Sequence, residues 1–243
     1  LLGLGGDDTL TGGAGNDRLE GGDGSDEVHQ QTGNDQVLTD GVLTGHGSDL
    51  LLSVEHAVLT GDAGANTIDA SAFTSGGVTL VGADGDDSLI GGTLSDQLDG
   101  GNGTDTGIIA FDGDLVLTDT TVIGPGSDTV VSIERFQVSG GAGPNRIDAS
   151  AYTLGAVTLD GGGGDDTLLG SSGDDDLIGG SGNNVIEQTT DADMVLTNSS
   201  LTGMGTDTLS GFRQAALTGG ASANLIDASG FTRDSVTLTG ADG

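Results

Sequence analysis

The sequence consists of successive copies of one long repeat, and the constant length of this repeat constrains the fold more than any other feature of the chain. Residues 68–73 read Ile-Asp-Ala-Ser-Ala-Phe, and closely similar hexapeptides return at residues 147–152 and 226–231. No insertion or deletion separates the three copies. In a repeat protein each unit buries its apolar edge against its neighbours, so a change of length in one unit would break the register of the next.

The spacing predicts one continuous solenoid. Its three copies comprise residues 1–79, 80–158 and 159–237, and residues 238–243 begin a fourth copy. Because the chain begins and stops within a repeat, we expect it to be part of a longer array.

A shorter repeat of nine residues runs inside each copy. Residues 12–20 read Gly-Gly-Ala-Gly-Asn-Asp-Arg-Leu-Glu, and residues 21–29 read Gly-Gly-Asp-Gly-Ser-Asp-Glu-Val-His. Both follow the pattern G-G-x-G-x-D-x-U-x, with U apolar, which is typical of calcium-binding parallel β-helices. Four nonapeptides stand in tandem in each copy, at residues 3–38, 82–117 and 161–196. These segments resemble the RTX, or hemolysin-type, calcium-binding repeats of secreted bacterial proteins.

The composition indicates how such a chain can become compact. It contains 49 Gly, 38 Asp plus Glu and only five Lys plus Arg, for a net charge of −33, and 2% aromatic residues. So few large side chains disfavour a conventional globular core. Repulsion between the carboxylates opposes any compact state. Divalent cations remove this repulsion, and carboxylate and carbonyl oxygens suit Ca²⁺.

The same composition excludes several classes of partner and site. An acidic chain lacks the basic patches that bind nucleic acid, so we expect no nucleic-acid partner. The chain has no cysteine, which excludes disulfides and thiolate metal sites. No apolar run approaches the length of a membrane span, so we expect none.

Gly-rich turns alternate with apolar triplets such as Thr9-Leu10-Thr11, in which one inward residue lies between two outward ones. A nonapeptide is then a turn plus a strand, and two nonapeptides close one coil. The spacing of turn residues along one edge predicts about four coils per copy (Asn66, Asp87, Asp105, Asp128 and Asn145). We therefore expect an all-β parallel β-solenoid, or β-roll, without helices; the resemblance and general crossover chirality imply a right-handed wind.

Three aromatic residues recur at one position of the repeat, namely Phe73, Tyr152 and Phe231. They could form a sugar-stacking platform or fill a wide coil from inside. We favour the second interpretation, because each follows a strand of the predicted core.

Calcium requires six to eight oxygen ligands, which a single turn cannot supply but two stacked turns can. The RTX resemblance implies that the upper turn gives the carbonyls of its second and fourth residues and its Asp. The turn two nonapeptides later gives the carbonyls of its first and third residues and its Asp.

Two sets of ligands follow from this resemblance. The first set joins Leu4, Gly6 and Asp8 to Gly21, Asp23 and Asp26; Ala83, Gly85 and Asp87 to Gly100, Asn102 and Asp105; and Gly162, Gly164 and Asp166 to Gly179, Ser181 and Asn184. The second set joins Gly13, Gly15 and Asp17 to Gln30, Thr32 and Asp35; Gly92, Leu94 and Asp96 to Ile109, Phe111 and Asp114; and Ser171, Gly173 and Asp175 to Gln188, Thr190 and Asp193.

Departures from the motif modify this prediction. Asn184 replaces an Asp, so its site should be weaker, and the fourth turn of each copy has lost its leading glycines and should end the calcium column on that edge. Asp49, Asp128 and Asp207 follow a partial motif and are additional candidate ligands. We expect about two Ca²⁺ per copy from ordinary sharing of two turns.

Nothing in the sequence indicates an enzyme. The three histidines, His29, His46 and His56, all lie in the first copy, and the chain has no Lys to assist acid–base chemistry.

We expect a calcium-binding structural segment of a large secreted or cell-surface bacterial protein, such as an adhesin stalk, a surface layer or an extracellular filament or sheath. It would fold and become rigid on binding calcium, contact neighbouring repeats of its own chain and self-associate through open strand edges. The alternative is the calcium-binding region of a secreted RTX toxin, lipase or protease.

Overall fold

The computed structural model describes residues 1–124 and 126–241, which form β-strands and turns without any helix. The prediction of an all-β chain is confirmed. The chain divides into two compact units. Unit 1 comprises Leu1–Ile108 and Pro125–Glu134, and unit 2 comprises Ile109–Gly124 and Arg135–Gly243. Of the predicted start of a fourth copy, residues 242–243 lie outside the described part of the chain.

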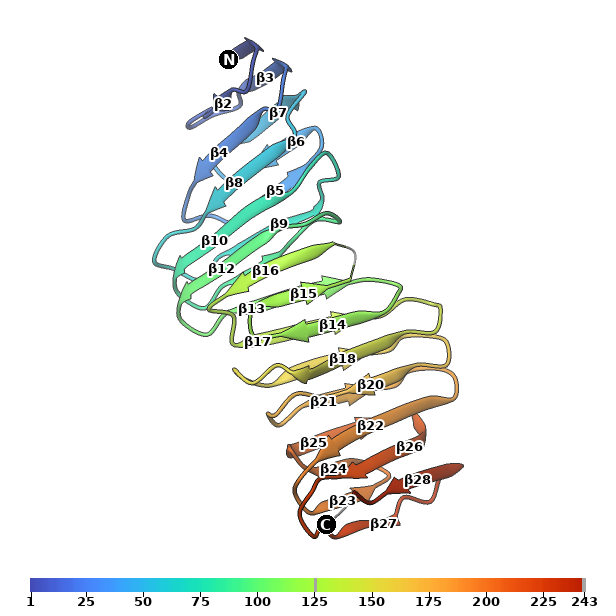
Figure 1. Ribbon diagram of the computed structural model, residues 1–243. Helices are drawn as coiled ribbons and strands as arrows, with labels where there is room; N and C mark the ends of the chain where they lie inside the picture. The colour runs from blue at the N-terminus through green and yellow to red at the C-terminus, as the bar shows by residue number, and fades with distance from the viewer. Residues whose placement is uncertain (125, 242–243) are drawn as a thin grey trace. The chain divides into compact units, whose positions relative to one another are not determined.

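Unit 1 contains two sheets, whose strands are labelled in Figure 1. The strand order of its first sheet is β1 (Leu2–Gly5), β3 (Arg18–Asp23), β7 (Ser48–Leu52), β6 (Val42–Thr44), β5 (Gln36–Thr39), β9 (Thr67–Ala72), β11 (Ser88–Ile90) and β13 (Thr106–Ala110). The order of its second sheet is β2 (Thr9–Leu10), β4 (Glu27–Gln31), β8 (His56–Thr60), β10 (Val78–Asp84), β12 (Gln97–Asn102) and β16 (Ser127–Val131).

Unit 2 also contains two sheets. One has the order β17 (Arg135–Ser139), β19 (Val157–Asp160), β21 (Asp176–Ile178), β25 (Gly205–Ser210), β24 (Ser200–Gly203), β23 (Met194–Thr197) and β27 (Ile226–Gly230). The other has the order β15 (Thr121–Ile123), β14 (Leu115–Thr118), β18 (Arg146–Ala151), β20 (Thr167–Leu169), β22 (Asn184–Thr190), β26 (Phe212–Gly219) and β28 (Ser235–Thr239).

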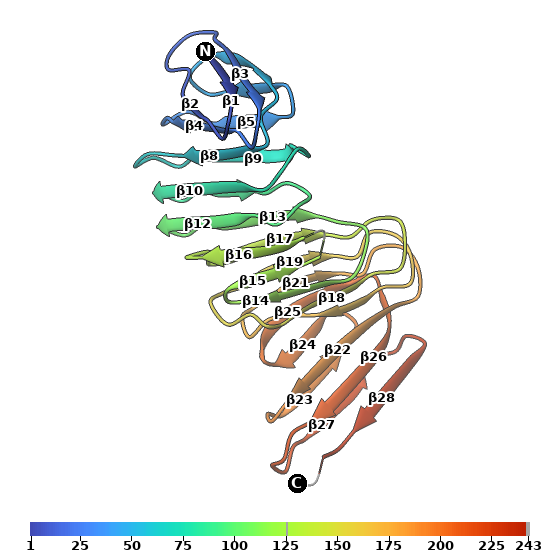
Figure 2. The ribbon, with the colours of Figure 1, turned by 45° about the horizontal axis from the view of Figure 1, so that its top comes forward.

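Within each unit the chain winds from one sheet to the other, so that strands two steps apart in sequence become parallel neighbours (Figure 2). In the nonapeptide segments the paired residues stand two nonapeptides apart, as in Thr9↔Glu27 and Ser88↔Thr106. This is the spacing predicted for a coil of two nonapeptides. The predicted strands and their parallel stacking are confirmed there, and the handedness of the wind stays a prediction.

The core is a narrow ladder of aliphatic side chains between the two sheets of each unit. In the first three nonapeptides of each copy the central residue of the strand triplet is buried, whereas its neighbours are partly or fully exposed, as the pattern of period two predicts. In the fourth nonapeptide the pattern is reversed: Val37, Val116 and Val195 are exposed, and the residues on either side of each are buried. Phe73, Tyr152 and Phe231 are buried as well. In unit 2, Tyr152 packs edge-on against Phe136 with ring centroids 5.3 Å apart. The aromatic position therefore fills the coil from inside, as predicted.

The prediction of all-parallel strands is wrong at one place in each copy. Strands β5, β6 and β7 form an antiparallel meander within the first sheet of unit 1. Strands β23, β24 and β25 repeat it in unit 2, where β14 and β15 are also antiparallel. The chain reverses at a threonine turn: the Thr39 hydroxyl accepts the N–H groups of Gly41 (3.3 Å) and Val42 (3.0 Å).

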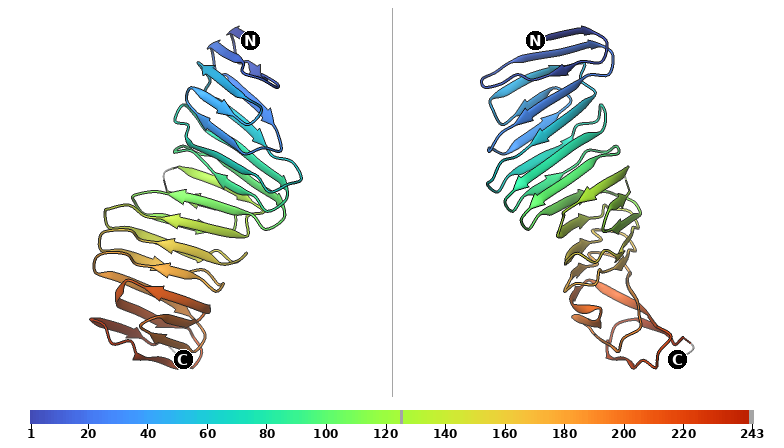
Figure 3. Two further views of the ribbon diagram at one scale, coloured as in Figure 1. Left: turned by 180° about the vertical axis from the view of Figure 1, so that it is seen from behind. Right: turned by 60° about the vertical axis from the view of Figure 1, so that its left-hand side comes forward.

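The meander also changes the number of coils. It keeps three strands in one sheet before the chain crosses, so one copy crosses between the sheets seven times and makes three and a half coils, not the predicted four. Equivalent strands of successive copies therefore lie in different sheets. In unit 1, β3 and its equivalent β12 do so, and in unit 2, β18 and its equivalent β27 do so. Figure 3 shows the stacked strands of both units from two further sides.

Candidate metal centre

The first set of predicted turns stacks as the sequence suggested. Leu4 lies opposite Gly22, and Ala83 lies opposite Gly101, in parallel ladders that continue from the strands into the turns. A bridge between Gly163 and Ser181 repeats this stacking in the third copy. We call these stacked turns the first column of each copy, with the aspartate pairs Asp8–Asp26 and Asp87–Asp105 and the pair Asp166–Asn184.

One oxygen of each lower side chain holds the turn above it. The N–H of Asp8 donates to Asp26 Oδ1 (2.9 Å), and the N–H of Asp87 donates to Asp105 Oδ1 (2.8 Å). In the third copy the N–H of Asp166 donates to Asn184 Oδ1 (2.8 Å). This ladder requires an acceptor at the sixth position of the lower turn, which Asp and Asn both provide.

The other carboxylate oxygen is left without a partner. Six aspartates of the described chain have a buried Oδ2 that accepts no hydrogen bond, and all six were predicted ligands (Asp8, Asp17, Asp26, Asp87, Asp105 and Asp166). A buried carboxylate oxygen without a donor is costly, and such groups are normally paired or bound to a metal. The unpaired oxygens therefore indicate where a cation fits.

The leading glycine of each turn leaves the space for that cation. A Cβ atom at Gly82 would overlap both Asp87 Oδ2 and the carbonyl oxygen of Gly100 in the next coil. A Cβ at Gly3 would likewise overlap Asp8 Oδ2 and the Gly21 carbonyl oxygen. One carboxylate oxygen and one carbonyl oxygen thus lie close together beside the glycine, and both are donors of the kind that Ca²⁺ prefers.

The upper turn contributes further carbonyls. Cβ atoms at Gly101 and Gly103 would overlap the carbonyl oxygens of Ala83 and Gly85, so these two oxygens face the next coil. Ala83 itself has φ of 86°, a left-handed conformation that is rare for a residue with a side chain. The carbonyls of the second and fourth positions are therefore directed as the RTX resemblance implied. Their coordination of an ion stays a prediction.

Burial raises the pKa of three first-column aspartates. Desolvation raises the pKa of Asp87, Asp105 and Asp166 above the usual 3.8, and neighbouring carboxylates such as that of Asp87 raise the pKa of Asp105 further. A positive ion at this position would reverse the shift, because it stabilises the charged form.

The predicted partner of the second set of turns is wrong. The turn that ends at Asp17 stacks on the turn that ends at Asp49: the N–H of Asp17 donates to Asp49 Oδ1 (2.9 Å), and that of Gly15 donates to the His46 carbonyl (2.9 Å). In the same way Asp96 N–H donates to Asp128 Oδ1 (3.0 Å), and Asp175 N–H donates to Asp207 Oδ1 (3.2 Å). We call these pairs the second column.

The meander explains why the Asp17 turn stacks on the Asp49 turn and not on the Asp35 turn. Strand β7, which follows it, lies beside β3, so the turn before β7 takes the position that the fourth nonapeptide turn was expected to occupy. Asp128 therefore follows Asp96 and not Asp105, so the predicted path along one edge is also wrong there. Asp49, Asp128 and Asp207, which were additional candidates, are the structural partners.

The fourth-turn residues are not brought to the second column. Asp35, Asp114 and Asp193 are exposed, and their Oδ1 atoms accept the N–H groups of Thr67, Arg146 and Leu225 at 2.8 to 2.9 Å. Gln30 is buried and donates to Gln36 Oε1 (3.0 Å), and it is part of the core instead of the turn. Other fourth-turn candidates pair with the next coil: the N–H of Thr32 donates to the Thr60 carbonyl (3.1 Å) and that of Phe111 to the Ser139 carbonyl (2.9 Å). Gln188 and Thr190 lie opposite Leu217 and Gly219 of β26.

The second column differs between copies. In the first copy Asp17 keeps an unpaired Oδ2, and Gly13 has φ of 88°. In the second copy Asp96 Oδ2 accepts the N–H of Gly92 (2.7 Å), and in the third Asp175 Oδ2 accepts the N–H of Ser171 (2.6 Å). The second-column turns of these two copies satisfy their own carboxylates, so an ion would have to displace a hydrogen bond.

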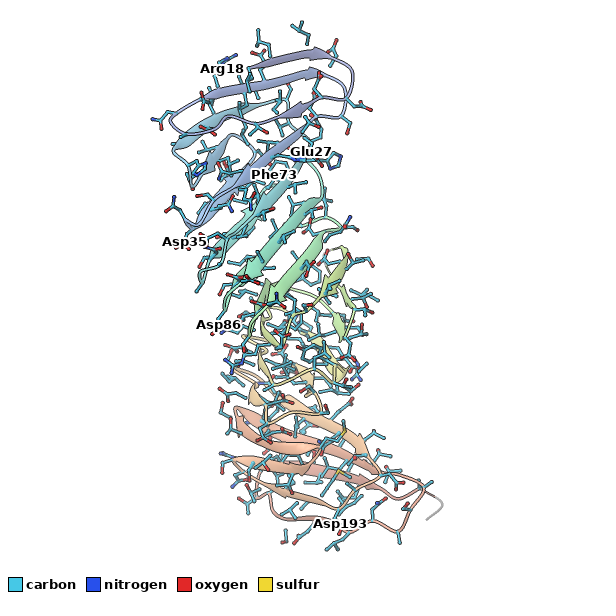
Figure 4. All side chains as sticks on the ribbon, turned by 90° about the vertical axis from the view of Figure 1, so that its left-hand side faces the viewer. Arg18, Glu27, Asp35, Phe73, Asp86 and Asp193 are labelled. Atoms are coloured by element: carbon cyan, nitrogen blue, oxygen red, sulfur yellow. The ribbon has the colours of Figure 1, made fainter. Side chains whose placement is uncertain are left out.

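Because a copy contains three and a half coils, equivalent columns lie on opposite edges of unit 1. The chain enters β2 and β4 of the second sheet from the turns of Asp8 and Asp26, whereas it enters β11 and β13 of the first sheet from those of Asp87 and Asp105. In Figure 4, the labelled side chains of Glu27 and Asp86, which neighbour the two columns, mark opposite edges.

The sequence interpretation missed two residues at the lower end of the first column. Glu55 Oε2 accepts the N–H of Asp26 (3.0 Å), and Glu134 Oε2 accepts the N–H of Asp105 (2.9 Å). Glu55 and Glu134 recur at one position of the long repeat, which could have marked them as candidates for the turn edge. They lie outside any nonapeptide, so the nine-residue motif did not include them. In residues 1–124 and 126–241, no group of three or more histidine, aspartate or glutamate side chains forms a metal cluster, so an ion would rely on carboxylate pairs and backbone carbonyls.

These features define a class: a parallel β-roll whose stacked glycine-rich turns carry buried aspartate pairs for calcium. The profile of the RTX calcium-binding nonapeptide repeat, in its form with four copies, matches residues 2–37, 76–107 and 158–186. These three segments are RTX calcium-binding nonapeptide repeats, and the chain is a calcium-binding RTX β-roll segment. A comparison with curated proteins found no match.

Proposed function

We propose that this chain is a non-enzymatic structural segment of a large secreted or cell-surface bacterial protein, such as an adhesin stalk, a surface layer or an extracellular filament. Proteins with RTX repeats are typically secreted bacterial proteins. The described residues contain no helix that could span a membrane. Calcium binding would drive folding and give the segment its stiffness.

The observation that carries this proposal is the set of buried, unpaired Oδ2 atoms in stacked turns. Each stacked pair of turns contributes oxygens from two successive coils, so an ion held there would join those coils. A bound Ca²⁺ would supply positive charge that makes close approach of the carboxylates favourable. Binding and coil stacking would therefore be coupled, as metal binding and folding are in other small metal-dependent domains.

Because the net charge is −33, the folded state should depend on the calcium concentration. At low calcium the carboxylates repel one another and favour an extended chain, which is suited to export. At the millimolar calcium outside a cell the turns close on their ions. The chain would then fold only after it has left the cell.

The distribution of polar residues supports a structural role and not catalysis. The equivalents of His29 in the second and third copies are Ile108 and Glu187. A catalytic histidine would be unique to the first copy, whereas the hydrogen-bond ladder of the first column returns in all three.

Circular dichroism with a calcium titration tests the proposal. We expect a disordered spectrum in EGTA and a cooperative gain of β signal as calcium is added, whereas magnesium at the same concentration should have little effect because it retains its water ligands. Small-angle scattering should report an extended chain without calcium and a compact particle with it. A strong β signal in chelator would contradict the proposal.

A further inference from the structure

The first column does not end with the nonapeptides in the first two copies. Asp26 holds the Asp8 turn through a carboxylate oxygen, and Glu55 holds the Asp26 turn in the same way, through Oε2 at 3.0 Å. Glu134 repeats this contact with Asp105 at 2.9 Å. The carboxylate ladder therefore continues one coil beyond the RTX motif.

The coil that carries the glutamate has a shorter turn. Glu20 lies opposite Leu52 and Glu27 lies opposite His56, so six turn residues of the upper coil face only three of the lower coil, residues 53–55. A shorter turn keeps its side chain farther from the coil above. The additional methylene of Glu, compared with Asp, compensates for this distance.

Two oxygens meet at this junction without a hydrogen between them. Asp26 is fully buried, and its Oδ2 accepts no hydrogen bond. A Cβ atom at Gly21 would overlap both Asp26 Oδ2 and the carbonyl oxygen of Ser53, so the two oxygens border one position. The second copy repeats this arrangement with Asp105 Oδ2 and the Ser132 carbonyl around Gly100.

The serine carbonyls are held in place by an unusual backbone conformation. Ser53 and Ser132 have φ of 49° and 50°, and they are two of only four described residues other than glycine with positive φ. The left-handed conformation is unfavourable for Ser, and such strain is usually kept where the surrounding structure requires it. Here it directs a carbonyl toward a buried carboxylate.

The third copy shows how the junction is satisfied without a cation. Asn184 stands where the other copies have Asp, and its Nδ2 donates to the Gly211 carbonyl at 3.1 Å. Gly211 is the equivalent of Ser53 and Ser132, and Arg213 replaces the glutamate. The amide nitrogen thus takes the place of the unpaired carboxylate oxygen and donates its hydrogen to the carbonyl, and the two carboxylates that the other copies place there are absent.

We propose that the first and second copies each hold an additional Ca²⁺ at this junction, which the third copy replaces with the Asn184 hydrogen bond. The ligands on the chain are Asp26 Oδ2, the Ser53 carbonyl and the Glu55 carboxylate, and in the second copy Asp105 Oδ2, the Ser132 carbonyl and the Glu134 carboxylate. The proposal rests on the calcium binding of the nonapeptide turns proposed above. All ligands are oxygens and two are carboxylates, which suits Ca²⁺.

The consequence is a difference between copies in how the nonapeptide array is joined to the coil after the meander. In the first two copies this junction would close only when calcium is bound. In the third it closes through a hydrogen bond at any calcium concentration.

Counting bound calcium on the whole 243-residue chain tests the proposal. Equilibrium dialysis against ⁴⁵Ca, with metal content by mass spectrometry, compares the wild type with the E55Q/E134Q variant. The matched control is D40N/D119N, which removes two carboxylates that accept hydrogen bonds from Thr74 and Thr153, at a position where the third copy already has Asn198. We expect E55Q/E134Q to bind about two fewer ions than the wild type and the control to bind the same number.

A gain of binding covers the case in which E55Q/E134Q fails to fold. N184D restores the carboxylate of the first column, and N184D/R213E also restores the glutamate. We expect the second substitution to add about one ion to the count of N184D. Equal counts for N184D and N184D/R213E, or for folded E55Q/E134Q and wild type, would overturn the additional site. A wild type that binds no calcium at all would instead refute the proposed function.

Discussion

Two kinds of acidic turn occur in this molecule, and they treat their carboxylates in opposite ways. The first-column turns bury one oxygen of each aspartate without a donor, as at Asp87 and Asp105. The meander turns expose their aspartates and give both oxygens a donor. Asp40 accepts the Thr74 N–H at 2.6 Å on Oδ1 and the Thr74 hydroxyl at 2.8 Å on Oδ2.

The pKa values follow this difference. Burial raises the pKa of Asp87 and Asp105, whereas hydrogen bonds from the backbone and side chain of Thr74 lower the pKa of Asp40. In the third copy Asn198 Oδ1 accepts the N–H of Thr232 and its Nδ2 donates to the Thr232 hydroxyl oxygen, so the meander position does not need a negative charge.

The comparison teaches that acidic residues alone do not indicate a calcium site. Both kinds of turn contain Asp in the first two copies and recur at fixed positions of the long repeat. Only the turns in which a buried carboxylate oxygen has no hydrogen-bond donor require a cation. The predictions below test this distinction.

Removal of calcium should have the largest effect. In EGTA we expect the first-column turns to separate and the β signal to be lost, because every buried carboxylate pair then repels without compensation. Hydrogen exchange followed by mass spectrometry measures protection turn by turn. If the meander turns lost protection in EGTA while the nonapeptide turns kept it, the comparison would be reversed.

A methyl group added at the leading glycine of a first-column turn should be the most damaging single change. Gly82→Ala would overlap Asp87 Oδ2 and the Gly100 carbonyl, so we expect a loss of calcium binding at that turn and a destabilisation of several kcal/mol, on the order of 3. Thermal unfolding in calcium measures it.

Gly41 in the meander is the control for Gly82. A Cβ at Gly41 meets no atom within 4 Å, and its φ is not positive. We expect Gly41→Ala to be neutral or to stabilise by about 0.5 kcal/mol. Equal losses of stability for Gly82→Ala and Gly41→Ala would show that the leading glycine of the first-column turn has no special role.

Neutralising one carboxylate should distinguish the two kinds of turn by a smaller effect, a change in calcium affinity. Asp105→Asn keeps the acceptor for the Asp87 N–H but removes the charge, so we expect roughly a tenfold loss of calcium affinity, about 1.4 kcal/mol per site. Asp119→Asn in the meander should leave affinity unchanged. Calorimetric titration of both variants decides, and a comparable loss for Asp119→Asn would contradict the assignment.

The response to pH should change sign with calcium. Without calcium, burial raises the pKa of Asp128 to about 6 and that of Asp207 to about 7, against an ordinary value of 3.8. Ionisation is then harder in the folded chain, so the calcium-free fold should lose stability as pH rises from about 4 to 7. With calcium bound the carboxylate form is favoured, and stability should be lost as pH falls.

Thermal melts at pH 5 and 7.5 check this reversal, with BAPTA in one series and calcium in the other. In BAPTA we expect a melting transition only at pH 5, and none at pH 7.5, where the calcium-free chain is expected to be unfolded. Asp40 serves as the internal reference. Its pKa is lowered by hydrogen bonds from Thr74, so its contribution is lost only as pH falls below its ordinary pKa and through the lowered one, with or without calcium. Melting temperatures that rose with pH in both series would contradict the reversal.

The smallest net effect is expected when a carboxylate is moved from one of two neighbouring turns to the other. The first copy has Gly33 and Asp62, whereas the second copy has Asp112 and Gly141. A Cβ at Gly33 would overlap the Asp62 carboxylate, and one at Gly141 would overlap Asp112. We expect Gly33→Asp alone to destabilise by about 1–3 kcal/mol through overpacking, and Gly33→Asp with Asp62→Gly to recover most of it. Denaturant unfolding gives both values, and additive losses would refute the exchange.

The first-column sites could be predicted because their information is local. Asp87 and Asp105 lie two nonapeptides apart, and a nonapeptide is just long enough for a strand plus a turn, so the stacking distance is contained in the spacing itself. The second column could not be predicted in the same way. Its partner for Asp17 is Asp49 and not Asp35, because the Thr39 turn reverses the chain and brings β7 beside β3.

The sequence by itself determined the nonapeptide strands, the parallel stacking of their coils and the acidic turns that bind calcium. These depend on period, on glycine and on the chemistry of Asp, all of which are read within two successive nonapeptides. Only the tertiary structure decided which sheet each copy enters, which turn follows Asp17 and Asp96, and that Glu55 extends the ladder. These depend on how many residues the meander keeps in one sheet, which its own hydrogen bonds set and no local pattern reports.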